Sequence, residues 1–292
     1  MGLIDLHVHA GPSVMPRALD GGDMLLEAEA AGYSAFVIKD HYFPTMMSAE
    51  LVEKHLGKGG CKVFGGLALN NSVGGINVKA VDTACAMGAK IIWMPTVSAL
   101  RHKQMHQGHG LAFPGSKGMT VEEKPIYYLD EHGALSPEVE AVLQYLKDRP
   151  DVILATGHGS RDEVDALIRR ASQLGIARIL VNHPHYMIGA SLADMAAWSQ
   201  LGAFIELNAT VFVPESRFCT NDINECCGII KAVGLEKIVL DSDYGQNKNG
   251  SPVSGLKAFI ELLKTTCGLD DAAIKRITEE NPAWLLNLKL GG

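Results

Sequence analysis

The stretch from Leu3 to Ala10 carries the clearest chemical pattern in this chain. It reads Leu-Ile-Asp-Leu-His-Val-His-Ala, an apolar strand that ends in His7 and His9. Alternate residues of a strand project to the same face, so these imidazoles point the same way, about 6.6–6.8 Å apart along the strand. Two neutral imidazoles on a rigid strand end form half of a metal site. The alternative is an ordinary pair of polar residues where a strand turns into a loop.

Other predicted strands also end in polar residues. Five of the eleven histidines lie within a residue or two of the ends of only three strands. Histidines with unrelated structural roles would not be expected to cluster at so few strand ends. These strand ends are therefore candidates for one shared site. The ends concerned are His7-Val8-His9, Lys39-Asp40-His41, Thr156-Gly157-His158, Asn182-His183-Pro184-His185-Tyr186, Glu206-Leu207-Asn208 and Asp241-Ser242-Asp243-Tyr244.

The elements that would position these side chains alternate regularly. Eight short, continuously apolar segments are each followed by a helical pattern, and glycine follows most helices. Continuous apolarity indicates strands covered on both faces, and glycine is a common helix stop. The pattern predicts a (β/α)₈ TIM barrel in the α/β class, a single domain over residues 1–292. A doubly wound open sheet is the alternative, but the sequence shows no Gly-rich phosphate turn after the first strand. The expected strands cover 3–8, 34–39, 61–69, 90–94, 152–155, 178–181, 203–207 and 237–240.

The alternation is interrupted between residues 97 and 137. This segment is rich in glycine and proline. Long loops in compact domains usually bind ligands or cover a site, so we expect an active-site insertion after the fourth strand. Arg101 and His102 lie nearest that strand and are candidates for substrate contact, whereas His106 and His109 fit a solvated loop.

Chemistry in a barrel of this kind takes place at the C-terminal ends of the strands. Imidazole and carboxylate ligands together suit Zn²⁺, and they also accept Mn²⁺, Fe²⁺ or Ni²⁺. An open coordination position would activate a water molecule, and a neighbouring carboxylate would move its proton. We assign that proton transfer to Asp241. Lys39 would neutralise a substrate carboxylate or phosphate as a point charge, and Tyr186 and Asn208 would orient the substrate.

The combined pattern resembles the amidohydrolase superfamily. The resemblance implies a metal-dependent barrel in which His7, His9 and Asp241 hold the first metal. His158 and His183 would hold a second metal, or His158 would complete the first site while His183 contacts substrate. The motifs that carry the resemblance span nearly the whole chain and are Asp5-Leu6-His7-Val8-His9, His158, His183, Asp241 and the closing Glu280-Asn281-Pro282-Ala283-Trp284-Leu285-Leu286.

One position departs from the superfamily pattern. Binuclear members usually place a bridging carboxylated lysine or a glutamate at the end of the fourth strand. Here that strand ends in Trp93-Met94-Pro95-Thr96, and Lys90 lies at its start. One metal ion, or a bridge from elsewhere in the chain, therefore fits the sequence as well as two ions.

A second pattern is similar to the PHP family of phosphoesterases, which has a smaller, distorted barrel and up to three metals. It rests on the same first strand together with Ile38-Lys39-Asp40-His41 and His183-Pro184, and it would make His41 a metal ligand. The chain lacks the glutamate usual after the third strand of that family. It also has Asp243-Tyr244-Gly245 where that family has Asp-x-His. The amidohydrolase resemblance is therefore favoured, and His41 is assigned either to the site, binding metal or substrate, or to a surface turn.

Bulk properties narrow the range of partners. The net charge is −7 and the chain has no long basic run, which argues against nucleic-acid binding. No apolar run is long enough to cross a bilayer, and the opening residues lack a basic leader. The six cysteines lack zinc-finger spacing, so we expect free thiols in a reducing cytoplasm. The sequence leaves open whether the chain forms a homo-oligomer.

These observations predict a metal-dependent hydrolase with one or two ions, most readily Zn²⁺. Activated water would attack an amide, ester or lactone of a small anionic molecule. Three alternatives stay open: a PHP-type phosphoesterase, a non-hydrolytic decarboxylase on the same metal site, and a catalytically inactive metal-binding barrel.

Overall fold

The computed structural model describes residues 2–108 and 119–289, and its strands form one eight-stranded parallel sheet. Neighbouring strands pair in chain order from the first to the eighth. The strands are β1 (Ile4–Val8), β2 (Ala35–Ile38), β3 (Lys62–Ala68), β4 (Ile91–Trp93), β5 (Ile153–Ala155), β6 (Ile179–Val181), β7 (Phe204–Asn208) and β8 (Ile238–Asp241).

Backbone hydrogen bonds just beyond the strand ends join β1 to β8. His9 N donates to Tyr244 O and Asp243 N donates to His7 O, both at 2.9 Å. The sheet is therefore rolled into the predicted (β/α)₈ barrel. Eight strands in this order fit the amidohydrolase expectation better than the smaller barrel of the PHP alternative.

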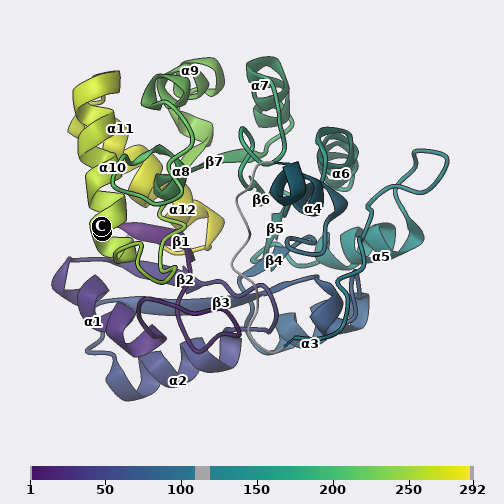
Figure 1. Ribbon diagram of the computed structural model, residues 1–292, viewed down its shortest axis with the longest axis horizontal. Coiled ribbons are helices and arrows are strands. Elements are labelled where there is room, and N and C mark those ends of the chain that lie inside the picture. Colours follow the sequence, from purple (N-terminus) through teal and green to yellow (C-terminus); the bar gives the residue numbers. More distant parts are fainter. Residues whose placement is uncertain (1, 109–118, 290–292) are drawn as a thin grey trace.

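Helices follow the strands and cover the outside of the barrel (Figure 1). Several begin where the sequence offers a side-chain cap: Asp20, Ser160 and Ser191 each form a capping box with the acidic residue three positions later. The helices are α1 (Gly21–Ala30), α2 (Met46–Leu56), α3 (Val78–Ala86), α4 (Leu100–Gly108), α5 (Pro137–Leu146), α6 (Arg161–Gln173), α7 (Leu192–Gln200), α8 (Ala209–Phe212), α9 (Ile223–Val233), α10 (Pro252–Cys267), α11 (Asp271–Lys275) and α12 (Asn281–Leu285).

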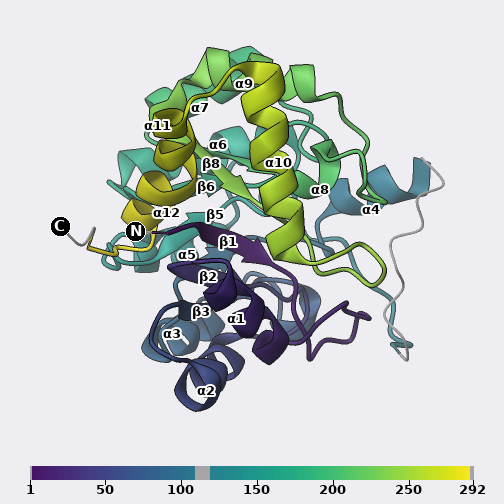
Figure 2. The same cartoon turned by 90° about the vertical axis from the view of Figure 1, so that its left-hand side faces the viewer.

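Two apolar cores separate the inside of the barrel from its outside. The larger one lies between strands and helices, and the smaller one fills the barrel with side chains such as Leu6, Trp93 and Phe204. Ala283 and Leu285 of α12 belong to the smaller core. Figure 2 shows α12 at one side of the barrel and α4 at the opposite side. The polar side chains are thereby left to the end that faces away from α12.

A bulge in β1 turns its histidines toward the site. Leu6 packs in the barrel interior and Val8 packs in the outer core, and the pairing register shifts between Asp5 and Val8. Asp5 Oδ1 accepts the His7 backbone N–H at 3.0 Å, in place of a partner strand. Bulges of this kind commonly re-aim side chains beside functional sites.

The predicted insertion after β4 contains a helix that the sequence did not indicate. This helix, α4, occupies much of the first part of the insertion. The sequence did not indicate it because its mixed polar residues form no apolar stripe. The segment returns to the barrel through a bridge between Ala99 and Ile126. His109 lies outside the described residues.

The expectation that all six cysteines are free thiols is wrong. Cys227 and Cys267 form a disulfide, while Cys61, Cys85, Cys219 and Cys226 are free. The two bonded residues are 40 positions apart and come from α9 and α10, which pack side by side. Because this contact is tertiary, cysteine spacing does not reveal it. The expectation of six free thiols therefore no longer supports a reducing compartment.

Among the described residues, every helix is too short or too polar to span a membrane.

Candidate metal centre

Five imidazoles form a closed ring at the C-terminal ends of the strands. Each ring centroid lies 5.0 to 6.1 Å from the next. All five side chains are buried. The structure thus brings together histidines that the sequence places after β1, β2, β5 and β6. In order around the ring they are His7, His9, His41, His158 and His183.

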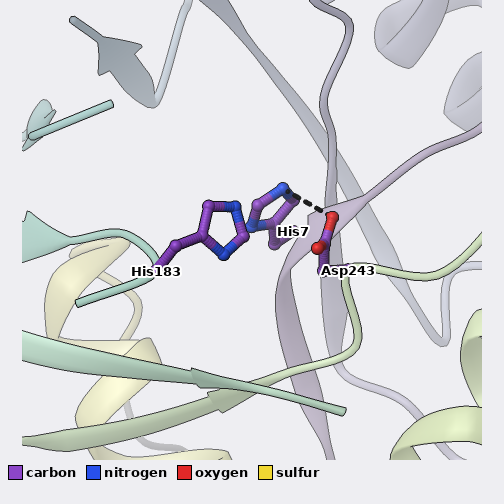
Figure 3. A group of neighbouring side chains, drawn as sticks. All are labelled: His7, His183 and Asp243. Carbon is purple, nitrogen blue, oxygen red and sulfur yellow. Dashed lines mark ion pairs between the residues drawn. The ribbon is translucent and has the colours of Figure 1, made fainter. Parts of the chain in front are cut away.

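The carboxylate of Asp243, in the segment that follows β8, reaches the Nε2 atoms of two of these histidines. Asp243 Oδ1 lies 3.1 Å from His7 Nε2 and 3.0 Å from His9 Nε2. Two ligands of one tetrahedral zinc ion would be about 3.3 Å apart, so this spacing suits a shared ion. His183 completes the group: His7, His183 and Asp243 offer ligand atoms that all lie within 4.8 Å of one another (Figure 3).

The histidines around Asp243 are held in the tautomer that a metal needs. In each, Nδ1 lies against an oxygen that can only accept, so Nδ1 carries the proton and Nε2 keeps its lone pair. Acceptors of this kind fix the ring and raise its basicity as a ligand. The pairs are His7 with Glu206 Oε1 at 2.9 Å, His9 with the Lys39 carbonyl at 3.1 Å and His183 with Asn208 Oδ1 at 2.7 Å.

Burial keeps most of these imidazoles neutral. It lowers the pKa of His9 to about 3 and that of His183 to about 4, and it holds the pKa of His41 and His158 well below the usual value. His7 differs. Burial and the nearby Lys39 act to lower its pKa, but Asp243 and Glu206 outweigh them and raise it. His9 and His183 thus supply neutral imidazoles, and their neighbour Asp243, despite its burial, has a pKa held well below its usual value by His7; donors of these types bind a divalent metal.

Two further charged groups lie beneath the ring. Glu206 points into the barrel, as expected from its place on β7, and Asn182 Nδ2 donates to its Oε2 at 3.1 Å. Lys39 is fully buried, with Nζ 2.9 Å from His7 Nε2 and 5.5 Å from the centroid of the Trp93 ring. Burial lowers the pKa of Lys39 to about 8, against the opposing effect of Asp243 and Glu206. Lys39 therefore lies against the same His7 nitrogen that faces Asp243, and it is not part of the cavity wall.

A family model matches residues 2–206, which is more than half of the chain, and the family is described as one of unknown function. The chain belongs to the DUF6282 family. No curated protein matches its sequence.

Several solved structures resemble this DUF6282 protein over nearly their full length. A metallopeptidase from Rhodobacter sphaeroides, bound to a phosphinate mimic of the dipeptide L-Ala-D-Ala, gives a TM-score of 0.59 at 13% identity and covers 99% of both chains. An amidohydrolase from Pseudomonas aeruginosa gives 0.59 at 11%, over 98% of this chain and 95% of that one. A lactonase from Listeria monocytogenes gives 0.59 at 12%, over 99% and 95%. The predicted resemblance to the amidohydrolase superfamily is confirmed at the level of the fold.

The Asp241 carboxylate contacts the backbone of β1, and among the described residues it forms no ion pair with a histidine. Its Oδ1 accepts the Leu6 backbone N–H at 2.6 Å at the β1–β8 seam, and the side chain is fully buried. Burial, followed by the neighbouring Glu206 and Asp5, raises the pKa of Asp241 well above its usual value. The carboxylate that meets the histidines is instead Asp243, two residues later and in a left-handed conformation with φ of 51°. The roles expected of Asp241 stay predictions, and Asp243 is the aspartate that contacts the histidines.

The far side of the ring is built differently. His158 Nδ1 lies 2.8 Å from His102 Nδ1, so one of these nitrogens carries the proton and the other accepts it. His41 Nδ1 lies 2.9 Å from Thr96 Oγ1. β4 ends without lysine or glutamate, as expected, and Lys90 instead pairs with Asp151 at the opposite end of the barrel.

A cavity of about 330 Å³ opens above the ring. Tyr186 and His102, both predicted to contact substrate, line it. Asn208 instead positions His183 from behind, and Arg101 turns away, with Nε donating to the Met187 carbonyl at 2.8 Å. The cavity wall also includes Met15, Arg17, Met105, Met187, Thr210, Val211, Phe218, Thr220, Asn221 and Gln246.

Sequence reasoning missed two charged residues of this site. Asp243 was visible in the Asp-x-Asp pattern after β8, but the pattern alone does not tell which carboxylate faces the histidines. Arg17 carried no signal at all, because it lies in the irregular loop between β1 and α1. Only the folded loop brings it to the cavity.

Proposed function

We propose that this DUF6282 protein is a metal-dependent hydrolase that cleaves an amide, ester or lactone in a small anionic molecule. The observation that supports this most directly is the convergence of the Nε2 atoms of His7 and His9 on Asp243 Oδ1, with His183 beside them. An oxygen acceptor behind each imidazole makes a chance cluster a poor explanation.

Zn²⁺ suits this donor set best, and Mn²⁺, Fe²⁺ or Ni²⁺ would also fit it. Such an ion, when bound, lowers the pKa of water and polarises a carbonyl.

The residues of the chain supply the remaining functions. Asp243 contacts both histidines through Oδ1, and we assign its other oxygen to take a proton from water and pass it to the leaving group. Tyr186 lies over His183, with 5.3 Å between ring centroids, and burial raises the pKa of its phenol well above the usual value. The phenol therefore stays protonated and can donate to a substrate oxygen.

Metal analysis combined with turnover tests this proposal. The full-length protein, loaded with Zn²⁺ or Mn²⁺, is assayed on N-acyl amino acids, lactones, phosphate monoesters and carboxylic acids that can lose CO₂. We expect bound metal and acyl hydrolysis, both lost in a His7→Ala variant that keeps its circular dichroism spectrum. CO₂ release without hydrolysis would favour the decarboxylase, phosphate release the phosphoesterase, and bound metal without any turnover an inactive barrel.

A further inference from the structure

Arg17 occupies an unusual position beside the histidine ring. It lies in the loop between β1 and α1, and its side chain lines the same cavity as His9, His41 and Asp243. Only 4% of that side chain is exposed. A charge that is buried to this extent normally pairs with a partner through hydrogen bonds.

The guanidinium of Arg17 lacks such partners on one edge. Its Nε and Nη2 atoms are buried and donate to no hydrogen-bond acceptor among the described residues. The nearest carboxylate oxygen, Asp40 Oδ2, lies 3.7 Å from Nη2, which is too far for a hydrogen bond. Nε and Nη2 form one fork of the guanidinium, the geometry that a carboxylate accepts with two parallel bonds.

Asp40 is itself already engaged. Its Oδ1 accepts the backbone N–H groups of Tyr42 at 2.8 Å and Phe43 at 3.1 Å, and its Oδ2 accepts from Ser13 Oγ. Asp40 thus anchors its own turn and offsets part of the charge of Arg17 without occupying the free edge.

The backbone around Arg17 is fixed from several sides. Arg17 forms a bridge with Gln246, and Ala18 N donates to Gly245 O at 2.9 Å. The neck of the loop is closed by Gly11 N, which donates to Leu19 O at 2.9 Å. A side chain mounted on so rigid a loop loses little conformational entropy when a ligand binds.

The other cations near the ring are less available. Lys39 is buried under His7, and Arg101 is bonded to the Met187 carbonyl. Asp243 lines the same cavity as Arg17, and a metal ion held by this carboxylate would offset its charge. The free edge of Arg17 is then the cationic group best placed for an anion beside the metal.

We propose that Arg17 binds a carboxylate of the substrate and makes the enzyme specific for acids. This inference rests on the proposed function, since the acyl group to be cleaved would lie at the histidines. Met15, Met187 and Phe218 line the cavity and would hold an uncharged part of the same molecule.

Calorimetric titration of the zinc-loaded, full-length protein with benzoate and with benzamide tests the proposal. Wild-type protein is expected to prefer benzoate, and Arg17→Gln to reduce that preference at least tenfold while benzamide binding changes little. Arg17→Lys keeps the charge but not the fork, and we expect it to lose most of the preference as well. Arg169→Gln, which removes one exposed charge on α6, should keep it.

The outcomes separate cleanly. An unchanged preference in Arg17→Gln, or an equal loss for benzamide, would overturn the proposal and leave Arg17 a structural residue. Phenyl phosphate is run in parallel, and a larger dependence on Arg17 for it than for benzoate would also overturn the assignment to carboxylates. Should Arg17→Gln fail to fold, the comparison between wild type and Arg17→Lys decides. Zinc content is measured on the same samples, so failure of the metal centre is seen separately from failure of the anion subsite.

Discussion

The two sides of the histidine ring differ in what stands behind each imidazole. On one side, the Nδ1 atoms of His7, His9 and His183 each lie against an oxygen that can only accept. Asp243 Oδ1 contacts the Nε2 atoms of His7 and His9, and His183 lies close to the same carboxylate. On the other side, His158 faces a second imidazole. The first arrangement suits a metal ion and its supporting acceptors. Among the described residues, His158 on the second side has an imidazole rather than a pure oxygen acceptor at Nδ1 and forms no ion pair with a carboxylate. We infer that the chain binds one ion tightly, and that the far side serves substrate.

The largest effect is expected from the carboxylate of the first side. Asp243→Asn should weaken zinc affinity by about a hundredfold or more, because it removes a charged ligand. Mutating a residue that only supports a metal ligand already lowers metal affinity by about 10–100-fold. Asp241→Asn is the matched control. Its amide oxygen can still accept from Leu6 N, so the contact at the β1–β8 seam is kept. Competition with a chromophoric chelator measures both variants.

The opposite ranking of these two variants would have a clear meaning. If Asp241→Asn released zinc and Asp243→Asn retained it, Asp241 at the seam would be the metal ligand. The assignment of this role to Asp243 would then be wrong.

A smaller effect on the tightly bound ion is expected from the other side of the ring. His158→Ala should lower the affinity for the first zinc by tenfold or less, since His158 makes no contact with Asp243 among the described residues. Wild-type protein titrated with zinc should bind one equivalent tightly, with any second equivalent at least tenfold weaker. Two equivalents of equal affinity, with one lost in His158→Ala, would show that both sides hold metal.

The sequence predicted the barrel well, because eight apolar segments separated by helical patterns leave few other folds. It also placed the histidines correctly, since the C-terminal ends of parallel strands must meet at one end of a barrel. It did not decide between Asp241 and Asp243, and the structure brings Asp243 into contact with the histidines. That choice depends on the β1–β8 seam, where Leu6 N takes up the first carboxylate.

Arg17 marks the other limit of sequence reasoning. Its contact with the cavity depends on a loop that is pinned to residues 245 and 246, more than 200 positions away. A pattern read within a short window cannot report a contact of that range.

The smallest effect on the metal is expected from the disulfide, which lies in the helical shell rather than at the ring. A cross-link that closes a loop of this length is worth about 2–4 kcal/mol of folding free energy, so Cys227→Ser should lower the melting temperature by several degrees. Zinc affinity should stay the same, because α9 and α10 supply none of the described ring residues. A phosphine reductant should bring wild type to the level of the variant, while Cys85→Ser, which alters a free thiol, should behave as wild type. A loss of zinc on reduction would instead tie the helical shell to the ring, and would break the separation between them on which this comparison depends.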